Sequence, residues 1–183
     1  MHNMPPTTPL TYSSSLAPYN ISPSLYFSAH PSLAGLVASA VIIHKNRALL
    51  IQRAAHDGFP LKWECPGGGV DLTDASILHA LCREVHEEAG LLVRHVVDVV
   101  DTVEFLGSSD QTTWRKITFL VVLEETEVPP VRLNAEEHVD AVWATEEDVV
   151  SGVCEGRQLE FAYEGQRQTV LDVLRRVNID IRT

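Results

Sequence analysis

Apolar stretches with strand-like character begin the folded part of the chain. Leu36–Ile43 is an apolar run with β-branched residues, and Ala48–Gln52 follows it after the polar turn His44–Asn46, which predicts a hairpin. Trp63–Cys65 predicts a short strand, stopped by Pro66 and the glycines that follow. These segments predict that a compact domain begins near residue 35.

The remaining chain mixes strand and helix patterns. Leu92–Phe105 and Ile117–Leu123 predict strands separated by the turn Gly107–Asp110, and Val139–Trp143 predicts a further short strand. Gln166–Val177 predicts a closing amphipathic helix. No internal repeat is visible in the sequence.

A central helix is predicted from Asp74 to Ala89, with Gly90 ending it. Its buried stripe consists of Ile77, Leu78, Leu81, Cys82, Val85 and Ala89. Thr145 is expected to cap an acidic turn that begins at Glu146. Strands before and after a central helix favour an α+β fold, in which helices pack on a curved mixed sheet.

Three carboxylates gather on one side of the central helix. At about 100° per residue, Glu84, Glu87 and Glu88 fall within an arc of about 100°. Like charges at these spacings destabilise a helix by roughly a few tenths of a kcal/mol per pair. A hard divalent cation reverses that sign, and Mg²⁺ typically binds one or two carboxylates together with substrate phosphates. The cluster therefore indicates a metal site for a phosphate-bearing substrate.

The segment Arg83–Leu91, reached from Pro66–Gly69, resembles the Nudix box. The pattern of that box is G-x5-E-x7-R-E-U-x-E-E-x-G-U, in which U is an aliphatic residue. Its second half matches at every fixed position, namely Arg83, Glu84, Val85, Glu87, Glu88, Gly90 and Leu91.

The first half of the box departs from this pattern. Counting back from Arg83 places Ala75 at the position of the first Glu, with Gly69 as the leading glycine. Aligning instead on Gly68 places Asp74 at that position and requires one inserted residue. We adopt the second alignment, because Asp74 can act as a carboxylate at the helix start and an insertion in a loop costs little. The box then runs from Gly68 to Leu91.

The resemblance implies an α/β/α sandwich with the box as a loop–helix–loop, and a hydrolase that depends on Mg²⁺ or Mn²⁺. It implies that Glu84, Glu87 and Glu88 are metal ligands together with a backbone carbonyl, which we assign to Gly67, and that one glutamate also serves as general base. Arg83 is the i,i+4 partner of Glu87, so we expect it to orient carboxylates without touching substrate.

Candidate residues also lie outside the helix. Arg53 ends the second predicted strand, where similar enzymes often hold a substrate phosphate; the alternative is a surface arginine. Glu136 and Glu137 occupy a loop in which family members often carry an extra catalytic or metal-binding Glu, and we assign that role to Glu137; the alternative is a solvated acidic loop. The other candidate substrate contacts are Gly68, Phe59 and Trp63, although glycines commonly just make turns and aromatic residues often lie in the core.

Histidines and cysteines add no metal motif. The eight histidines lack an H-x-x-x-H spacing, and four are interpreted as scattered surface residues: His44, His56, His79 and His138. Cys65, Cys82 and Cys154 form no C-x-x-C pair and are expected to be reduced thiols of an intracellular protein.

Three functions fit these residues. The first is a metal-dependent hydrolase that cleaves a diphosphate linkage in a nucleoside diphosphate derivative. The second is a non-catalytic Nudix-like nucleotide-binding module, favoured by the irregular first half of the box. The third is an isoprenoid diphosphate isomerase, which needs an acid and a cysteine across an apolar pocket, and for which Cys65 is the candidate. The intact carboxylates favour the hydrolase.

The net charge of the chain limits which kinds of molecule it can bind. The net charge of −11, from 25 acidic and 14 basic residues, argues against a partner that is a nucleic-acid polymer and suits a small-molecule diphosphate substrate only if a metal ion offsets the repulsion. Targeting and membrane segments are not evident in the sequence. The first 44 residues contain no Asp, Glu, Lys or Arg, so they resemble neither a secretory signal nor a mitochondrial transit peptide. No apolar run reaches the length of a membrane span. We expect a cytoplasmic protein, and a homodimer is compatible with the sequence.

The chain is expected to have two parts. Residues 1–34 form an extension rich in Pro and Ser, with six of the ten prolines, and its aromatic residues predict that part of it packs on the domain. Residues 35–183 are expected to form the domain that resembles Nudix hydrolases.

Overall fold

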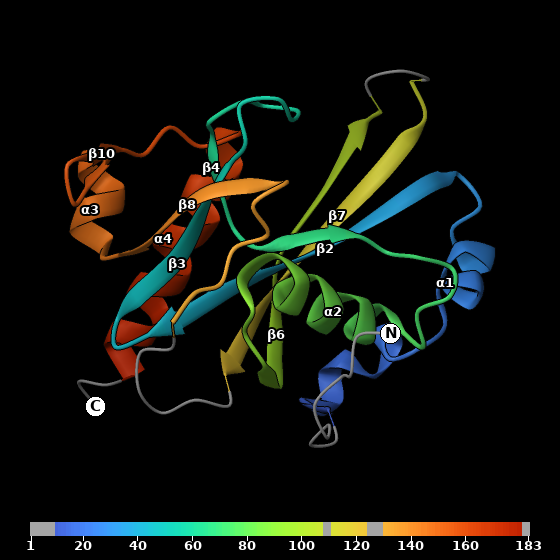
Figure 1. Ribbon diagram of the computed structural model, residues 1–183. Helices are drawn as coiled ribbons and strands as arrows, with labels where there is room; N and C mark the ends of the chain where they lie inside the picture. The colour runs from blue at the N-terminus through green and yellow to red at the C-terminus, as the bar shows by residue number, and fades with distance from the viewer. Residues whose placement is uncertain (1–9, 108–110, 124–129, 181–183) are drawn as a thin grey trace.

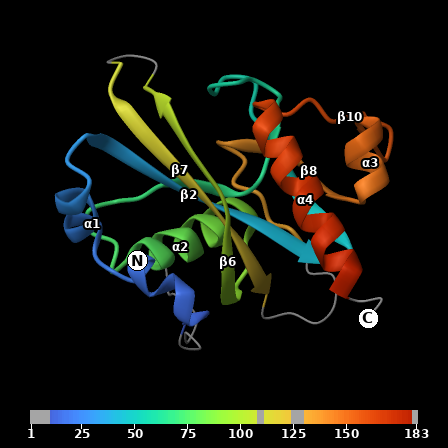
Figure 2. The ribbon, with the colours of Figure 1, turned by 180° about the vertical axis from the view of Figure 1, so that it is seen from behind.

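A computed structural model of the protein describes residues 10–107, 111–123 and 130–180, with side chains described to residue 177. A mixed sheet lies between two layers of helices (Figures 1 and 2). The main strands are β1 (Thr11–Tyr12), β2 (Leu33–His44), β3 (Arg47–Arg53), β4 (Trp63–Glu64), β5 (Gly67–Gly69), β6 (Val93–Leu106), β7 (Thr113–Leu123) and β8 (His138–Ala144). The helices are η1 (Ser14–Tyr19), α1 (Pro23–Ala29), α2 (Ile77–Ala89), α3 (Glu146–Ser151) and α4 (Glu164–Asp180).

The sheet has the strand order β1-β6-β7-β2-β3-β4, with β5 paired to β2 and β8 paired to β3. The β2–β7 and β1–β6 pairs are parallel, whereas the other pairs are antiparallel. A separate small ribbon joins β9 (Val153–Cys154) to β10 (Arg157–Gln158). The mixed sheet confirms the expected α+β class.

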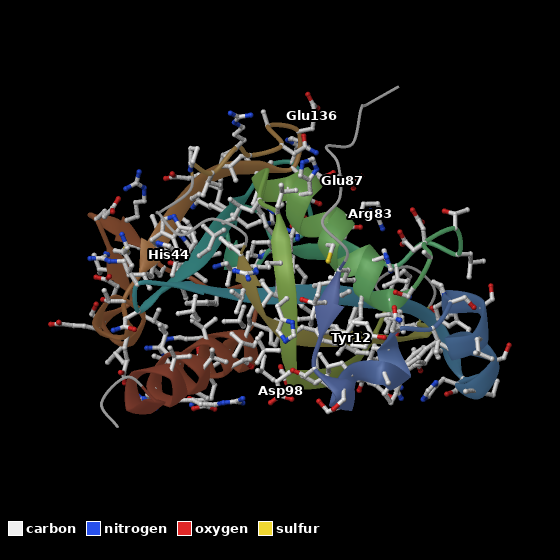
Figure 3. All side chains as sticks on the ribbon, turned by 90° about the horizontal axis from the view of Figure 1, so that it is seen from below. Tyr12, His44, Arg83, Glu87, Asp98 and Glu136 are labelled. Carbon is white, nitrogen blue, oxygen red and sulfur yellow. The ribbon has the colours of Figure 1, made fainter. Side chains whose placement is uncertain are left out.

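Both faces of the sheet are buried at β2, which explains why this segment is apolar at consecutive positions. Ala40 and Ile42 belong to the core on the α2 side, whereas Val41 belongs to the core on the α4 side. Figure 3, seen from below, shows α2 and α4 on opposite sides of the sheet. The expected α/β/α sandwich is therefore confirmed.

Local sequence signals account for several of these elements. The β2–β3 hairpin turns through Lys45 and Asn46, whose φ angles of 46° and 60° are those of a primed turn. Thr145 caps α3 in a capping box with Asp148, and Gly90 ends α2 with a φ of 70°. The hairpin and both helix ends are confirmed.

The predicted start of the central helix is wrong. α2 begins at Ile77 because Ser76 is its N-cap and accepts a hydrogen bond from the His79 N–H at 3.2 Å. Asp74 therefore lies in the preceding loop. Helices η1 and α1 and strands β1, β5, β9 and β10 were not predicted, and residues 108–110 of the predicted Gly107–Asp110 turn lie outside the described residues.

The N-terminal segment contributes to the core beside α2. Leu16 and Tyr26 are buried in the same apolar cluster as the helix. The Ile77 N–H donates to the Ile21 carbonyl at 3.3 Å, which ties this segment to the start of α2. Within the described part of the chain, none of the helices has both the length and the apolar character needed to cross a membrane.

Candidate active site

Strand β5 brings glycine backbone close to the carboxylates of α2. The Gly67 N–H donates to Glu88 Oε2 at 2.6 Å. A Cβ at Gly67, where φ is 148°, would lie 2.4 Å from the Ala38 carbonyl oxygen, and a Cβ at Gly68 would lie 2.5 Å from Glu84 Oε2. Gly67 therefore requires glycine, because a side chain would separate β5 from β2, whereas a side chain at Gly68 would displace the Glu84 carboxylate.

Arg83 organises the carboxylates that face outward from α2. Its guanidinium donates to both oxygens of Asp74 at 3.0 Å, to Glu84 Oε1 at 2.7 Å and to Glu87 Oε2 at 2.9 Å. It also donates to the Gly69 carbonyl at 2.9 Å. Burial alone would raise the pKa of Asp74, but the hydrogen bonds from Arg83 and from the Asp71 N–H outweigh it, so that pKa is lowered. Arg83 does not line the cavity described below.

The carboxyl groups of Glu84 and Glu88, which line the cavity, are harder to ionise than free carboxyl groups. Burial raises the pKa of Glu84 and raises the pKa of Glu88 to about 9, even though Glu88 accepts the Gly67 N–H. The neighbouring charge of Glu64 raises the Glu88 pKa further. Ionised Glu88 is therefore unfavourable unless a cation comes close.

Strands β3, β4 and β8 supply the opposite wall of the site. Arg53 Nη1 lies 2.5 Å from Glu64 Oε1, and Arg53 also pairs with Asp57 and donates to the Gly58 carbonyl at 2.5 Å. His138 Nε2 lies 3.3 Å from Glu64 Oε1. Arg53 is thus a paired residue facing the site rather than an isolated surface arginine.

His138 corrects the interpretation of the histidines as scattered surface residues. It is 2% exposed and lies between Glu64 and Glu88, whereas His56 and His79 are exposed and His44 is half-buried. The strand pattern contained the necessary signal. Extending Val139–Trp143 back by one residue places His138 on the same face as the buried Val142 and Ala144.

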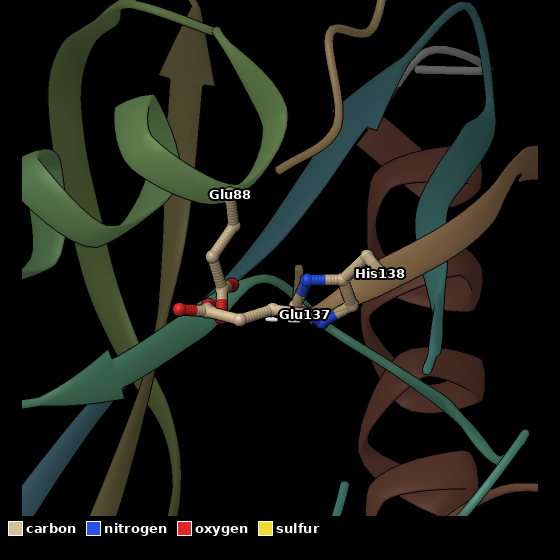
Figure 4. A group of neighbouring side chains, drawn as sticks. All are labelled: Glu88, Glu137 and His138. Atoms are coloured by element: carbon tan, nitrogen blue, oxygen red, sulfur yellow. Dashed lines mark ion pairs between the residues drawn. The ribbon is translucent and has the colours of Figure 1, made fainter. Parts of the chain in front are cut away.

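A cavity of about 470 Å³ collects these groups. Its lining consists of Arg53, His56, Asp57, Gly67, Gly68, Gly69, Glu84, Glu88, Glu136, Glu137 and His138. Figure 4 shows the side chains of Glu88, Glu137 and His138 converging from α2 and from the start of β8. Glu87 does not line the cavity, and its side chain is 54% exposed beside Arg83.

The two aromatic candidates have different positions. Trp63 is 1% exposed, and its indole N–H donates to the Gln158 carbonyl at 2.8 Å, so its ring lies in the core and is not open to a substrate. Phe59 is 64% exposed in the loop that follows the cavity residue Asp57. Phe59 and Leu61 both have positive φ, 55° and 59°, an unfavourable backbone that holds two apolar side chains in solvent.

The residues at the cavity suit a divalent cation. Glu88, Glu137 and His138 each offer a ligand atom, and these atoms lie within 4.8 Å of one another. Glu84 adds a further carboxylate to the same cavity. Oxygen-rich sites of this kind match the preference of Mg²⁺ and Mn²⁺.

The cysteines do not contribute to this site. All three are free thiols, and none of them lines the cavity. Burial raises the pKa of the Cys65 thiol to about 12. A buried, protonated thiol outside the cavity gives the isoprenoid isomerase no support.

Sequence comparison decides the family of this chain. The model of the NUDIX domain family matches residues 34–170. The chain belongs to the Nudix family. A curated Nudix relative, the uncharacterised Nudix hydrolase NudL of Enterobacter sp. (strain 638), is 37% identical over 98 residues, which are 52% of this chain and 47% of the relative. The match therefore spans about half the length of that relative.

Solved Nudix structures share the fold. The MutT protein of Methanosarcina mazei Go1 is 25% identical with a TM-score of 0.59, over 79% of this chain and 94% of that one. The NUDIX domain of Shewanella oneidensis NrtR, solved with ADP-ribose, is 18% identical with a TM-score of 0.57, over 88% and 99%. A C. elegans Ap4A hydrolase is 20% identical with a TM-score of 0.55, over 81% and 98%.

Proposed function

We propose that this Nudix protein is a pyrophosphohydrolase that uses Mg²⁺ or Mn²⁺ to cleave a diphosphate linkage in a nucleoside diphosphate derivative. The observation that supports it is the convergence of Glu84, Glu88 and Glu137 with Arg53 and the Gly67–Gly69 backbone around one cavity. The named ligand or substrate of two structural neighbours, ADP-ribose and Ap4A, contains a phosphoanhydride. The acidic cavity repels such a group by itself, so substrate and cation would bind together.

Each residue has a proposed role. Glu84, Glu87 and Glu88, with the Gly67 carbonyl, would hold the cation, and Glu87 would have to turn from Arg83 toward the cavity. A bound divalent cation neutralises phosphate charge and lowers the pKa of a water molecule. Glu84 or Glu137 accepts the proton of the attacking water, a contribution of about 10²–10⁴-fold for general bases.

Other residues position the substrate and the carboxylates. Arg53 and Gly68 both line the cavity. Arg53 would donate to a phosphate oxygen, and the Gly68 backbone would approach the diphosphate. Phe59 contacts the base or another apolar part of the substrate. Arg83 keeps Glu84 and Glu87 oriented.

Turnover of a substrate panel tests the proposal. ADP-ribose, diadenosine tetraphosphate and nucleoside diphosphate sugars are incubated with the full chain and Mg²⁺, Mn²⁺ or Ca²⁺, with and without excess chelator. We expect cleavage with Mg²⁺ or Mn²⁺, loss of cleavage with chelator, and poor activity with Ca²⁺. Equal turnover in chelator would contradict the metal requirement, whereas tight binding of nucleotides without any cleavage would favour the non-catalytic binding module.

A further inference from the structure

The imidazole of His138 is buried, and only one of its two nitrogens has a hydrogen-bond partner. Its side chain is 1% exposed, and Nδ1 has no hydrogen-bond partner among the residues that the structure describes. Nε2 faces two carboxylates, with Glu64 Oε1 at 3.3 Å and Glu88 Oε1 at 3.9 Å. Buried side-chain nitrogens nearly always have partners, so packing alone does not explain this ring.

The Glu88 and Glu64 carboxylates are each held by another group, and one oxygen of each faces the His138 ring. Glu88 Oε2 accepts the Gly67 N–H at 2.6 Å, and Oε1 is the oxygen turned to His138. Arg53 Nη1 holds the Glu64 carboxylate at 2.5 Å. Glu137, the residue before His138, places a third carboxylate beside them (Figure 4).

The backbone also directs His138 toward the site. His138 opens β8 opposite Arg53, and the β3–β8 register shifts between Gln52 and Arg53. Such bulges often lie beside active sites and re-aim side chains. Here the irregularity coincides with the two residues of this strand pair, Arg53 and His138, that line the cavity.

We propose that His138 adds a nitrogen ligand to the cation site that includes Glu88 and that Glu137 is a further ligand of the same cation. The ligand atom is Nε2, which faces Glu88, and the ring proton then sits on Nδ1. This mixed site prefers Mn²⁺ or Co²⁺ to Mg²⁺. This inference rests on the proposed metal site but not on any substrate. The ligand atoms lie within 4.8 Å of one another, close to twice the usual metal–ligand bond length of about 2.0–2.3 Å. Imidazole favours transition metals, whereas Mg²⁺ prefers oxygen ligands.

Pulsed electron paramagnetic resonance of bound Mn²⁺ tests the nitrogen bond directly, without turnover. The full chain is freed of metal, loaded with less than one equivalent of Mn²⁺, and examined for modulation by a directly bound ¹⁴N nucleus. The variants are His138→Gln and the matched control His56→Gln, which changes the other histidine that lines the cavity. We expect nitrogen modulation in the wild type and in His56→Gln, and its loss in His138→Gln.

Metal affinity provides a second measurement. In calorimetric titrations, His138→Gln should weaken Mn²⁺ and Co²⁺ binding at least about 10-fold. Mg²⁺ affinity should change less than about 3-fold, because oxygen ligands remain. Equal losses for all three ions would show that His138 only supports the fold and would overturn the proposal.

The wild-type spectrum shows whether a histidine nitrogen binds Mn²⁺ even if His138→Gln does not fold. Labelling histidine with ¹⁵N should change the modulation, and a spectrum without histidine coupling would overturn the proposal. Coupling that persists in folded His138→Gln would also overturn it. Cleavage of a diphosphate with Mg²⁺ in the absence of nitrogen coupling would leave the proposed function intact, whereas coupling without cleavage would retain this metal site and reject the hydrolase.

Discussion

The outer and inner sides of α2 both carry carboxylates, but only the outer side is neutralised by the protein itself. On the outer side, Arg83 binds Asp74 and Glu87, and the pKa of Asp74 is lowered. On the inner side, Glu88 lines the cavity, and burial together with the neighbouring charge of Glu64 raises the Glu88 pKa to about 9. Glu84 lies between the two sides, bonded to Arg83 and lining the cavity.

Because of this difference, residues on the outer side of α2 should affect mainly stability, and residues on the inner side mainly function. The outer cluster is electrostatically complete without a ligand, so Asp74 should contribute mainly to the fold, and Glu87 can join the metal site only by leaving Arg83. On the inner side, ionising Glu88 costs free energy in the metal-free protein, so this is the side on which a cation would be stabilised. Substitutions on the two sides should therefore affect different measurements.

The largest effect is expected for Glu88→Gln. It should lower kcat by on the order of 10²–10³-fold, because it removes the buried charge that faces the cavity while an oxygen remains to accept the Gly67 N–H. Glu87→Gln, on the exposed flank, should lower kcat by about 10-fold. Steady-state kinetics of both variants measure this ratio. If Glu87→Gln were the more damaging change, the distinction between the two sides would be wrong.

Glu137→Gln should come next, with a loss of about 10–10²-fold in kcat and little change in KM, because Glu137 acts mainly in the transition state whether it is a metal ligand or the general base. Glu136→Gln is the matched control and should be nearly silent, since the contact of Glu136 with His56 is made by its backbone carbonyl. A large loss of kcat in Glu136→Gln alone would show that the catalytic acid of this loop is Glu136 and not Glu137.

The pH dependence of stability should have opposite signs on the two sides. A folded-state pKa of about 9 at Glu88 means that the native metal-free protein binds a proton that the unfolded chain has released above about pH 4.5, so stability should fall as pH rises through this window. Asp74 has a lowered pKa, so its contribution is present above about pH 3.8 and is lost as pH falls further.

Chemical unfolding in chelator, measured from acid to mildly alkaline pH, checks these signs. Glu88→Gln should flatten the loss of stability between about pH 4.5 and 9. Asp74→Asn should flatten the acid limb below about pH 3.8. An unchanged profile in Glu88→Gln would mean that this carboxyl is ionised in the metal-free protein.

Local signals in the sequence predicted the outer side of α2 better than the inner side. The i,i+4 spacing of Arg83 and Glu87 predicts their ion pair. The glycines before the helix predict the turn that leads to it, and Gly90 predicts its end. The inner wall depends on β3 pairing with β8, which are distant in sequence. For that reason the sequence suggested Arg53 and Glu137 only by resemblance and did not indicate Glu64 as part of the site. His138 was wrongly interpreted as a surface residue, although the strand alternation of β8 places it on a buried face.

Composition alone also could not separate core aromatics from exposed ones. Trp63 and Phe59 lie four positions apart and were equivalent candidates, yet one is in the core and the other in solvent. The β4 pairing with β3 buries Trp63, whereas a loop with positive φ exposes Phe59. Both outcomes follow from tertiary contacts and turn geometry that no short window of sequence specifies.

The smallest catalytic effect is expected for Asp74→Ala. Asp74 binds Arg83 through both oxygens and accepts the Asp71 N–H at 2.8 Å, so its removal should lower the free energy of unfolding by about 1–3 kcal/mol. kcat should change by less than about 3-fold, because Arg83 keeps its bonds to Glu84 and Glu87. Asp71→Ala, at an exposed side chain 4.0 Å from Arg83, is the control and should change neither quantity. If Asp74→Ala reduced kcat as severely as Glu88→Gln, Asp74 would act as the first acid of the box, and the two sides of α2 would form one catalytic unit.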